Sequence, residues 1–374
     1  MCVFWGLRIK AFVRRNAVLT IAVAAALVTM ILVPPDAQYL DYFDLKTLSC
    51  LFCVLAVVCA LKNVRFFYAL ARQIVRRFST MRSCVLALVY ITFIGSMLIA
   101  NDMALLTFLP LGFLVLETTG KRQYMAFTFI MQNIAANLGG MLTPFGNPQN
   151  LYLYSRFGIP DAQFLTIMAP PFAVAIVLIT ACCLIGVRAE PLRLPEEPVT
   201  VDRKKTALYL VLFALSIAIV FRSIPYVIGL IVIPLVLMFV DRKALMMVDY
   251  PLLFTFVAFF VFAGNLSRLP MVHDLLSELL SRNTLLVSVL SCQCISNVPT
   301  AVLLSNFTTD YPSLLIGVNI GGAGTLIASL ASLITYREYV KHNPDGKRMY
   351  IFKFSLYNFA FLAVLTAVSL ALGY

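Results

Sequence analysis

Apolar residues in this chain come in runs of about 15 to 25 positions, separated by short segments that carry most of the charge. A helix needs about 20 apolar residues to cross the roughly 30 Å hydrocarbon core of a bilayer, so these runs predict transmembrane helices. The runs lack the strict alternation of polar and apolar residues that marks the strands of a transmembrane barrel. The pattern therefore predicts an all-α polytopic membrane protein.

The runs differ in kind. Simple spans are expected at 17–33, 45–61, 165–187, 207–221, 226–240, 250–265 and 350–372. Broken transmembrane helices are expected at 123–158 and 313–336, where glycine, proline or polar residues interrupt the run. Residues 84–117 and 284–311 are too long for one helix and have polar centres, so we interpret them as re-entrant helical hairpins. The segment 62–82 mixes aromatic and basic residues and predicts one helix lying in the interface.

The basic residues are distributed unevenly between the two sides that this arrangement creates. With both hairpins re-entrant, 24 of the 29 Lys and Arg fall on one side. The five on the other side are Lys46, Arg156, Arg222, Arg268 and Arg282. Cytoplasmic loops carry the excess of Lys and Arg, so the sequence predicts a cytoplasmic N-terminus and an external C-terminus.

An internal repeat divides the chain. The stretch Asn137 to Thr143 and the stretch Asn319 to Thr325 share the pattern Asn-x-Gly-Gly-x-x-Thr, 182 positions apart. The same offset pairs Asn147 with Ser329 and Asn150 with Ser332, and a predicted hairpin precedes each copy. The topology makes the two copies enter from opposite sides, so residues 1–187 and 225–374 are interpreted as inverted repeats. Residues 188–224 form a cytoplasmic linker and an extra span.

Inverted repeats whose broken helices meet near the bilayer midplane are the architecture of secondary transporters. Breaks in a helix free backbone groups, which at membrane depth need protein, water or a bound ion as partners. Freed carbonyls can coordinate a cation, and exposed N–H groups at helix N-termini favour an anion. The alternative is that the glycines and prolines only allow kinks and close packing.

Asp102 is the acid that falls near the centre of an apolar segment. A carboxylate at that depth is costly unless it is paired, hydrated or protonated, so it is a functional candidate. It could ligate a cation or carry a proton. The alternative is that Asp102 caps the second helix of its hairpin. The broken segments have no Lys or Arg at their cores, so an anion would be held by hydroxyls, amides, helix N-termini or a co-bound cation.

The composition supports the same class. The chain is 61% hydrophobic and 12% charged, whereas soluble proteins are about 25% charged. The net charge of +12 is explained by orientation and does not indicate a nucleic acid partner. Two histidines and nine cysteines form no recognisable metal or nucleophile motif, and the cysteines are interpreted as packing residues. We therefore expect neither an enzyme nor a cofactor, and no metal beyond a possible sodium ion.

At this point the sequence resembles the ion transporter superfamily, which includes citrate and dicarboxylate symporters, arsenite permeases and sodium/proton antiporters. In length and motifs it is similar to the short bacterial permeases of the YbiR type. The resemblance runs over nearly the whole chain and rests on four ordered motifs. These are Ala-Asn-Asp-Met-Ala-Leu-Leu-Thr-Phe-Leu-Pro at 100–110, Leu-Thr-Pro-Phe-Gly-Asn-Pro-Gln-Asn at 142–150, Ile-Ser-Asn-Val-Pro-Thr at 295–300, and the stretch 319–332.

The resemblance implies a homodimer in which each protomer has a scaffold part and a transport part that moves. In the sodium-coupled dicarboxylate branch, each hairpin tip bears a Ser-Asn-Thr motif that touches substrate and sodium. Here Ala100-Asn101-Asp102 stands at the first tip and Ser296-Asn297-Val298 at the second, so only the asparagine is kept in both. These departures look more like the arsenite-permease branch and favour proton coupling or a different anion.

We expect a secondary active transporter that moves a small anion, either an organic carboxylate such as citrate or an inorganic oxyanion, coupled to sodium or protons. The alternatives are a sodium/proton antiporter and an arsenite or metalloid efflux permease. The substrate is expected at Asn101, Asn147, Asn150, Ser296, Asn297 and Thr300. Ion binding or proton coupling is expected at Asn101, Asp102, Asn137, Gly139, Thr143, Gly146, Asn319, Gly321, Thr325 and Ser329.

Overall fold

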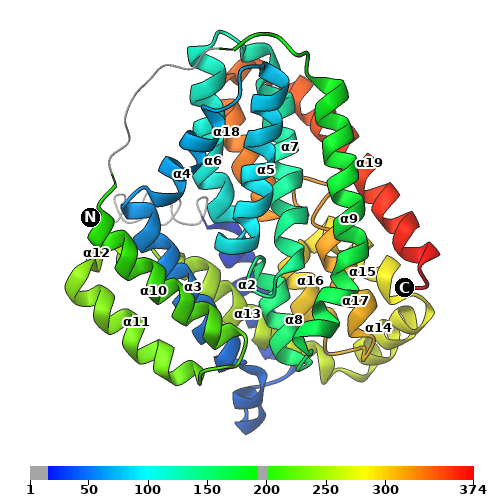
Figure 1. Ribbon diagram of the computed structural model, residues 1–374. Helices are drawn as coiled ribbons and strands as arrows, with labels where there is room; N and C mark the ends of the chain where they lie inside the picture. Colours follow the sequence, from blue (N-terminus) through cyan, green and yellow to red (C-terminus); the bar gives the residue numbers. More distant parts are fainter. Residues whose placement is uncertain (1–15, 193–200) are drawn as a thin grey trace, which may run out of the picture.

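The computed structural model describes residues 16–192 and 201–374, and these residues fold almost entirely into helices (Figure 1). The first repeat contributes α2 (Ala17–Leu32), α3 (Leu45–Asn63), α4 (Phe66–Val75), α5 (Met81–Ile99), α6 (Asn101–Thr118), α7 (Met125–Gly139), α8 (Pro148–Arg156) and α9 (Asp161–Gly186). Then follow α10 (Arg203–Val220), α11 (Tyr226–Val240), α12 (Arg242–Met246), α13 (Tyr250–Ser267) and α14 (Pro270–Arg282). The chain ends with α15 (Thr284–Ile295), α16 (Asn297–Leu304), α17 (Tyr311–Ile320), α18 (Leu330–His342) and α19 (Lys347–Ala371).

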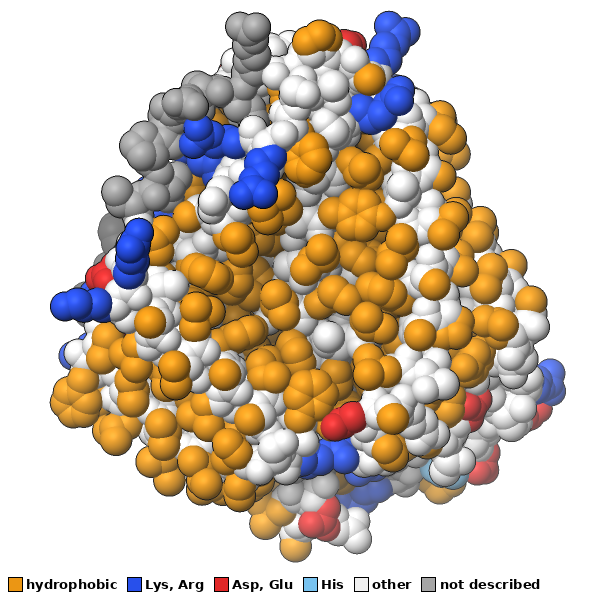
Figure 2. Space-filling model, viewed as in Figure 1, with side chains coloured by type: hydrophobic (Ala, Val, Ile, Leu, Met, Phe, Trp, Pro, Cys, Tyr) orange, Lys and Arg blue, Asp and Glu red, His pale blue; other side chains and the backbone are white. Residues whose placement is uncertain are grey.

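Length and composition confirm the predicted membrane class. Six of the described helices are long and apolar enough to cross a membrane: α3, α5, α6, α9, α13 and the segment 344–371 that contains α19. Figure 2 shows hydrophobic side chains over the middle of the molecule and basic side chains toward its rims. Since an aqueous protein rarely exposes so broad an apolar surface, the chain is an all-α polytopic membrane protein.

Acidic residues start many of these helices. The carboxylate of Asp44 accepts the N–H of Thr47 at 2.9 Å, Asp249 accepts that of Leu252 at 3.0 Å, and Asp310 accepts that of Ser313 at 3.2 Å. An acceptor at this position satisfies backbone donors that the first helical turn leaves unpaired. The few acids of the chain are thus largely used at helix ends, which sets Asp102 apart.

The helices form two groups joined by short connecting helices. In the scaffold, defined as α2, α3 and α10–α13, α2 packs along α13 and α11 packs along α3. In the hairpin group, defined as α5–α9 and α15–α19, α5 and α6 pack on α7 while α15 and α16 pack on α17. Helix α4 links α3 to α5, and α14 links α13 to α15. The same packing thus recurs in both halves of the chain, while α10 lies against α3 and α11.

The two halves run in opposite directions through the hairpin group. Figure 1 shows α5, α6, α7 and α18 in the upper part of the molecule, and α8, α15, α16 and α17 in the lower part. The first broken helix therefore starts at the top with α7 and ends below with α8. The second starts below with α17 and ends above with α18. The fold is the predicted one, an inverted repeat with two helical hairpins and two broken helices.

Polar contacts join the loops into two sets, one at each end of the molecule. These sets are the same as those that the distribution of Lys and Arg assigns to the two sides. At one end Arg268 pairs with Asp36 at 2.6 Å, and Arg156 donates to Asn306 at 3.4 Å. At the other end the Asn63 amide donates to Asp241 at 3.0 Å, and Lys121 pairs with Glu190. Each contact joins segments that the distribution of Lys and Arg places on one side.

Two predicted segments have different boundaries in the structure, and one helix was not predicted. The single interfacial helix expected at 62–82 is shorter, because α3 continues to Asn63, Arg65 turns into the left-handed region at φ 56°, and Thr80 caps α5. Helix α14 was not expected, although its proline at the first position is a helix-start signal. The second broken segment continues to His342 instead of ending at Tyr336.

Candidate functional site

Each hairpin turns at one residue with unusual backbone geometry. Ala100 separates α5 from α6 at φ 66°, ψ 151°, and Ser296 separates α15 from α16 at φ 74°, ψ 157°. This region is populated almost only by glycine, so each tip stores strain of roughly 1–3 kcal/mol. The following asparagine is identical in both tips: the side-chain oxygens of Asn101 and Asn297 each accept the next backbone N–H at 2.9 Å. The two tips are therefore built alike.

Each tip is fixed to its own broken helix by matched contacts. The Thr143 hydroxyl donates to the carbonyl of Met97 at 2.7 Å, and the Thr325 hydroxyl donates to that of Gln293 at 3.1 Å. Both acceptors lie three residues before the strained residue. Equivalent threonines thus make the same contact, at the same spacing from the tip, in both halves.

The predicted glycines make a second matched contact. A Cβ atom on Gly139 would lie 2.6 Å from the Ser96 hydroxyl, and one on Gly321 would lie 2.9 Å from the Cys292 Cβ. The backbone of each broken helix therefore touches the first helix of its hairpin. Gly146 also leaves no room for a side chain, because a Cβ atom there would lie 2.3 Å from the carbonyl oxygen of Gly140. Close packing accounts for all three glycines.

The two broken helices cross through a reciprocal pair of hydrogen bonds. The Ser329 hydroxyl donates to Asn137 Oδ1 at 2.8 Å, and the Asn147 amide donates to Asn319 Oδ1 at 3.2 Å. Adding the repeat offset of 182 to 137 and 147 gives 319 and 329, so these are one contact made twice. Two halves related by an approximate two-fold axis make the same contact twice where they meet at that axis. It brings together four of the predicted site residues.

Further amides complete this centre. The Asn101 side chain donates to Asn137 at 3.2 Å, and that of Asn319 donates to Asn150 at 2.6 Å. Asn150 in turn donates to the carbonyls of Met141 and Thr143, each at 3.1 Å. We call the following buried residues the amide cluster: Asn101, Asn137, Asn147, Asn150, Asn297, Asn319 and Ser329.

Three buried acceptor atoms at or beside the cluster have no protein donor. They are Asn147 Oδ1, Gln149 Oε1 and Asp102 Oδ1. A buried acceptor without a donor costs about 1–3 kcal/mol, so such atoms indicate a role beyond packing. Carbonyl and carboxylate oxygens are ligands for hard cations such as sodium and acceptors for hydroxylated ligands. The residues present therefore fit a sodium ion or a ligand that donates hydrogen bonds.

Asp102 is the second residue of α6, directly after the first tip, and it is partly exposed. The capping alternative is not seen: within residues 16–192 and 201–374, no hydrogen bond to its carboxylate is formed. Its own N–H is instead accepted by the side chain of Asn101. The carboxylate is therefore free to bind a cation or a proton.

Sequence reasoning missed Gln293 and Gln149. The Gln293 amide donates to the carbonyls of Gly321 at 2.9 Å and Ala323 at 3.2 Å, and its oxygen accepts the N–H of Thr325 at 2.9 Å. Gln149 donates to Asn319 at 3.3 Å. Gln293 is a neutral amide inside an apolar run, and Gln149 lies within the Asn-Pro-Gln-Asn motif at 147–150; these are the available sequence signals. The predicted Thr300 lies near but uses its hydroxyl on the carbonyl of Ser296 at 2.7 Å.

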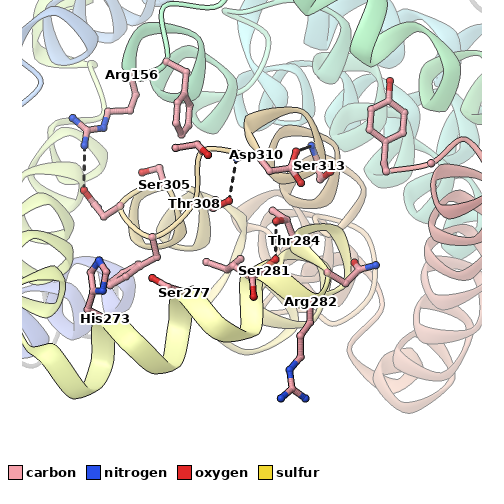
Figure 3. Close-up of a pocket in the computed structure, with 18 residues that line it drawn as sticks. Arg156, His273, Ser277, Ser281, Arg282, Thr284, Ser305, Thr308, Asp310 and Ser313 are labelled. Carbon is pink, nitrogen blue, oxygen red and sulfur yellow. Dashed lines mark hydrogen bonds between the residues drawn. The ribbon is translucent and has the colours of Figure 1, made fainter.

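A cavity of about 980 Å³ lies away from the amide cluster, at the base of the second hairpin (Figure 3). Its charged side chains have protein partners. Arg282, which points out of the cavity in Figure 3, pairs with Glu278 at 2.6 Å, and Asp310 caps α17. The Arg156 guanidinium donates to Asn306. A second cavity of about 490 Å³ separates the 41–46 segment and α13 from α8 and α16. Neither cavity has the buried unpartnered atoms of the cluster.

Comparison with known proteins finds transporters. The family model described as "Citrate transporter" matches residues 3–311. An uncharacterised transporter of Methanocaldococcus jannaschii is 30% identical over 78% of this chain and 80% of its own. The inner membrane protein YbiR of Escherichia coli is 31% identical over 73% of this chain and 74% of its own. A silicon efflux transporter of Oryza sativa is 30% identical, over 39% of this chain and 30% of its own.

Proposed function

Because the chain belongs to the citrate transporter family, we propose that it is a secondary active transporter that carries a small anion across the membrane by alternating access. The anion is an organic carboxylate such as citrate or a dicarboxylate, or an inorganic oxyanion, and sodium or protons drive its movement. One observation carries this proposal: two equivalent strained tips meet the crossing of two broken helices at a buried cluster of neutral amides.

Helix ends supply the attraction for an anion. Four helices begin at the cluster, since α6 starts at Asn101, α8 at Pro148, α16 at Asn297 and α18 at Leu330. The N-terminus of a helix carries partial positive charge and unpaired N–H groups, which favour anions. Among the buried residues of 16–192 and 201–374, none is a Lys or Arg. An anion would therefore bind without a formal counter-charge from the protein, which leaves room for a co-transported cation.

Coupling requires a site whose occupancy changes the cost of moving the tips. The unpartnered oxygens of Asp102 and Asn147 can accept a sodium ion, and the Asp102 carboxylate can accept a proton. Either ion would give an otherwise unpartnered acceptor a partner before the tip crosses the barrier between the two sides. The site residues predicted from the sequence are proposed in these roles.

Two other functions remain candidates, and a specific observation favours each. The unpartnered carboxylate oxygen of Asp102 favours a sodium/proton antiporter. The silicon efflux relative favours efflux of a weak oxyacid, a class that includes arsenite and other metalloid acids. The neutral amides would suit an uncharged hydroxylated substrate, because they can both donate and accept hydrogen bonds.

We further propose the arrangement in the membrane. The two hairpins are re-entrant, the basic end faces the cytoplasm of a bacterial inner membrane, and the C-terminus lies outside. The distribution of Lys and Arg supports this orientation. The working unit is a homodimer, as in the families that the sequence resembles.

Uptake into proteoliposomes tests the function. We expect labelled citrate, a dicarboxylate or an inorganic oxyanion to accumulate when a sodium or proton gradient is applied. Asn297→Ala should abolish accumulation, and Asn306→Ala, which alters an amide at the far end of α16, should not. Exchange of sodium for protons without any oxyanion flux would contradict the anion proposal and select the antiporter. Protection of a sensitised host from arsenite would select efflux.

A further inference from the structure

The turn between α10 and α11 reaches out of the scaffold and touches the first broken helix at two places. The Arg222 guanidinium donates to the Tyr154 carbonyl at 2.7 Å, and its central carbon lies 4.2 Å from the centre of the Tyr154 ring. The neighbouring Phe221 packs edge-to-face on Phe145 of the unwound loop, with ring centres 5.8 Å apart. One turn thus contacts both ends of the segment that contains Asn147 and Asn150.

This contact stands out within the scaffold. Among the described residues of α10–α13, Arg222 is the one that hydrogen-bonds the hairpin group. Its backbone has φ 61°, a left-handed conformation that is costly for a residue with a side chain. Tyr154 is held from the other side as well, because its hydroxyl donates to Asp161 at the start of α9. The guanidinium therefore meets a ring that is already fixed.

The second repeat lacks this arrangement. The repeat offset of 182 places Tyr336 where Tyr154 stands in the first repeat. Tyr336 packs on Tyr350 of α19, inside the hairpin group, with ring centres 6.1 Å apart. Within residues 201–267, no hydrogen bond reaches α18. The extra span α10, which belongs to neither repeat, thus gives the first broken helix a scaffold contact that the second does not have.

We propose that Phe221 and Arg222 form a clamp that positions the outer half of the first broken helix, and with it Asn147 and Asn150, against the scaffold. Arg222 is a positioning residue, since it acts on the site through Tyr154 and α8. The clamp also joins the two groups that alternating access separates. It therefore opens once in each transport cycle, and this last consequence rests on the proposed function.

Hydrogen exchange read by mass spectrometry tests the clamp in the full-length protein without any substrate. In Arg222→Gln, exchange of residues 143–156 should rise about tenfold, because the substitution removes a charge-assisted hydrogen bond and a cation–π interaction together. Exchange in α3 and α13 should stay unchanged. Arg268→Gln is the matched control, because it removes an arginine at the same end whose partner, Asp36, lies within the scaffold loops. Arg268→Gln should leave the exchange of residues 143–156 unchanged.

A double-mutant cycle separates positioning from general stability. Tyr154→Leu keeps the backbone acceptor but removes the ring, so alone it should raise exchange in 143–156 by a smaller factor. In the Arg222→Gln background, Tyr154→Leu should raise the exchange of residues 143–156 by a smaller factor than it does in the wild-type background. Unchanged exchange of residues 143–156 in Arg222→Gln overturns the clamp. If Arg222→Gln does not fold, Phe221→Leu, which removes the ring contact on Phe145, decides in its place: faster exchange supports the clamp and unchanged exchange overturns it. These results stand whether or not uptake is detected, so a failure of the clamp is distinguishable from a failure of the proposed function.

Discussion

The two hairpin tips share one backbone design and differ in how they are held. At the second tip, the Asn297 N–H and the Ser296 hydroxyl both donate to the Ala328 carbonyl, at 2.9 Å and 3.2 Å. The first tip replaces Ser296 by Ala100. Within residues 16–192, no hydrogen bond joins Asn101 to Gly146, the residue equivalent to Ala328. Beyond the matched threonine bonds, the second tip thus makes two further hydrogen bonds to its own unwound loop that have no counterpart among residues 16–192.

The first tip instead carries Asp102 in place of Val298. A carboxylate oxygen without a partner stands where the other tip has an apolar side chain. The equivalent positions therefore differ, with an apolar side chain at the second tip and a carboxyl group at the first. If the protein is the proposed ion-coupled transporter, we expect the coupling ion to act at the first tip.

The largest effect is expected from Asp102→Asn, which removes the charge and keeps the shape. Gradient-driven uptake in proteoliposomes should fall to background, because the amide can neither bind a proton nor neutralise sodium. Asp310→Asn is the matched control: asparagine also caps helices well, so uptake should persist. Uptake that survives in Asp102→Asn with the same dependence on the gradient would move coupling away from the first tip.

Gln293→Met should loosen the second tip, because it introduces the residue found at the equivalent position, Met97, in the first. The change removes three hydrogen bonds to the unwound loop and leaves buried backbone groups unpaired. We expect a loss of about 1–3 kcal/mol in the free energy of unfolding and faster hydrogen exchange in residues 321–329. Exchange in residues 140–147 provides the internal control. Equal exchange in both proteins would show that Gln293 does not hold the loop.

Glycine substitutions at the two tips should give different results although the backbone strain is the same. Ala100→Gly relieves a positive φ without removing a hydrogen bond, so it should stabilise the protein by roughly 1 kcal/mol. Ser296→Gly gains the same relief but loses the hydroxyl bond to Ala328, so its net effect should be near zero. Thermal unfolding in detergent measures both. A similar gain at both tips would mean that the Ser296 bond contributes nothing.

The smallest effect on stability is expected at the ion pair of Arg268 with Asp36, which lies in the loops outside both tips. The hydrogen bond and charge of Arg268 lower the pKa of Asp36 below its ordinary value. Because the folded-state pKa is depressed, the contribution to stability is present above about pH 4 and is lost as the pH falls through the folded-state value. Thermal unfolding of Arg268→Gln should therefore differ slightly from wild type at pH 7 and converge with it in acid. A difference that persists in acid would assign the effect to packing.

Much of this architecture follows from the sequence, for physical reasons. Apolar runs predict spans because a helix needs about 20 apolar residues to cross a bilayer, and the 24-to-5 division of Lys and Arg favours hairpins that turn back. The matched Asn-x-Gly-Gly-x-x-Thr stretches locate the crossing, since Asn137 and Asn319 lie at its centre. Helix α14 was missed because it is short and mixed in polarity, so no apolar run marks it.

The contacts that distinguish the two halves could not be predicted in the same way. Gln293 bonds a loop 28 to 32 residues away, and Arg222 bonds Tyr154 across 68 positions. Neither partner is implied by local pattern, because each depends on how helices of different groups pack. The close approach of Gly139 and Gly321 to the first helix of each hairpin depends on the same packing, and their expected ion-binding role stays a prediction.

A map of the protein bound to its substrate tests the central claim most directly, which is that the two tips and the crossing helices form one site. Samples prepared with citrate and sodium, and with silicic acid, would be compared by electron cryo-microscopy. The account predicts that one of these ligands produces density in contact with Asn101, Asn147 and Asn297. Ligand density confined to the 980 Å³ cavity at the base of the second hairpin, with the amide cluster unchanged, would contradict it.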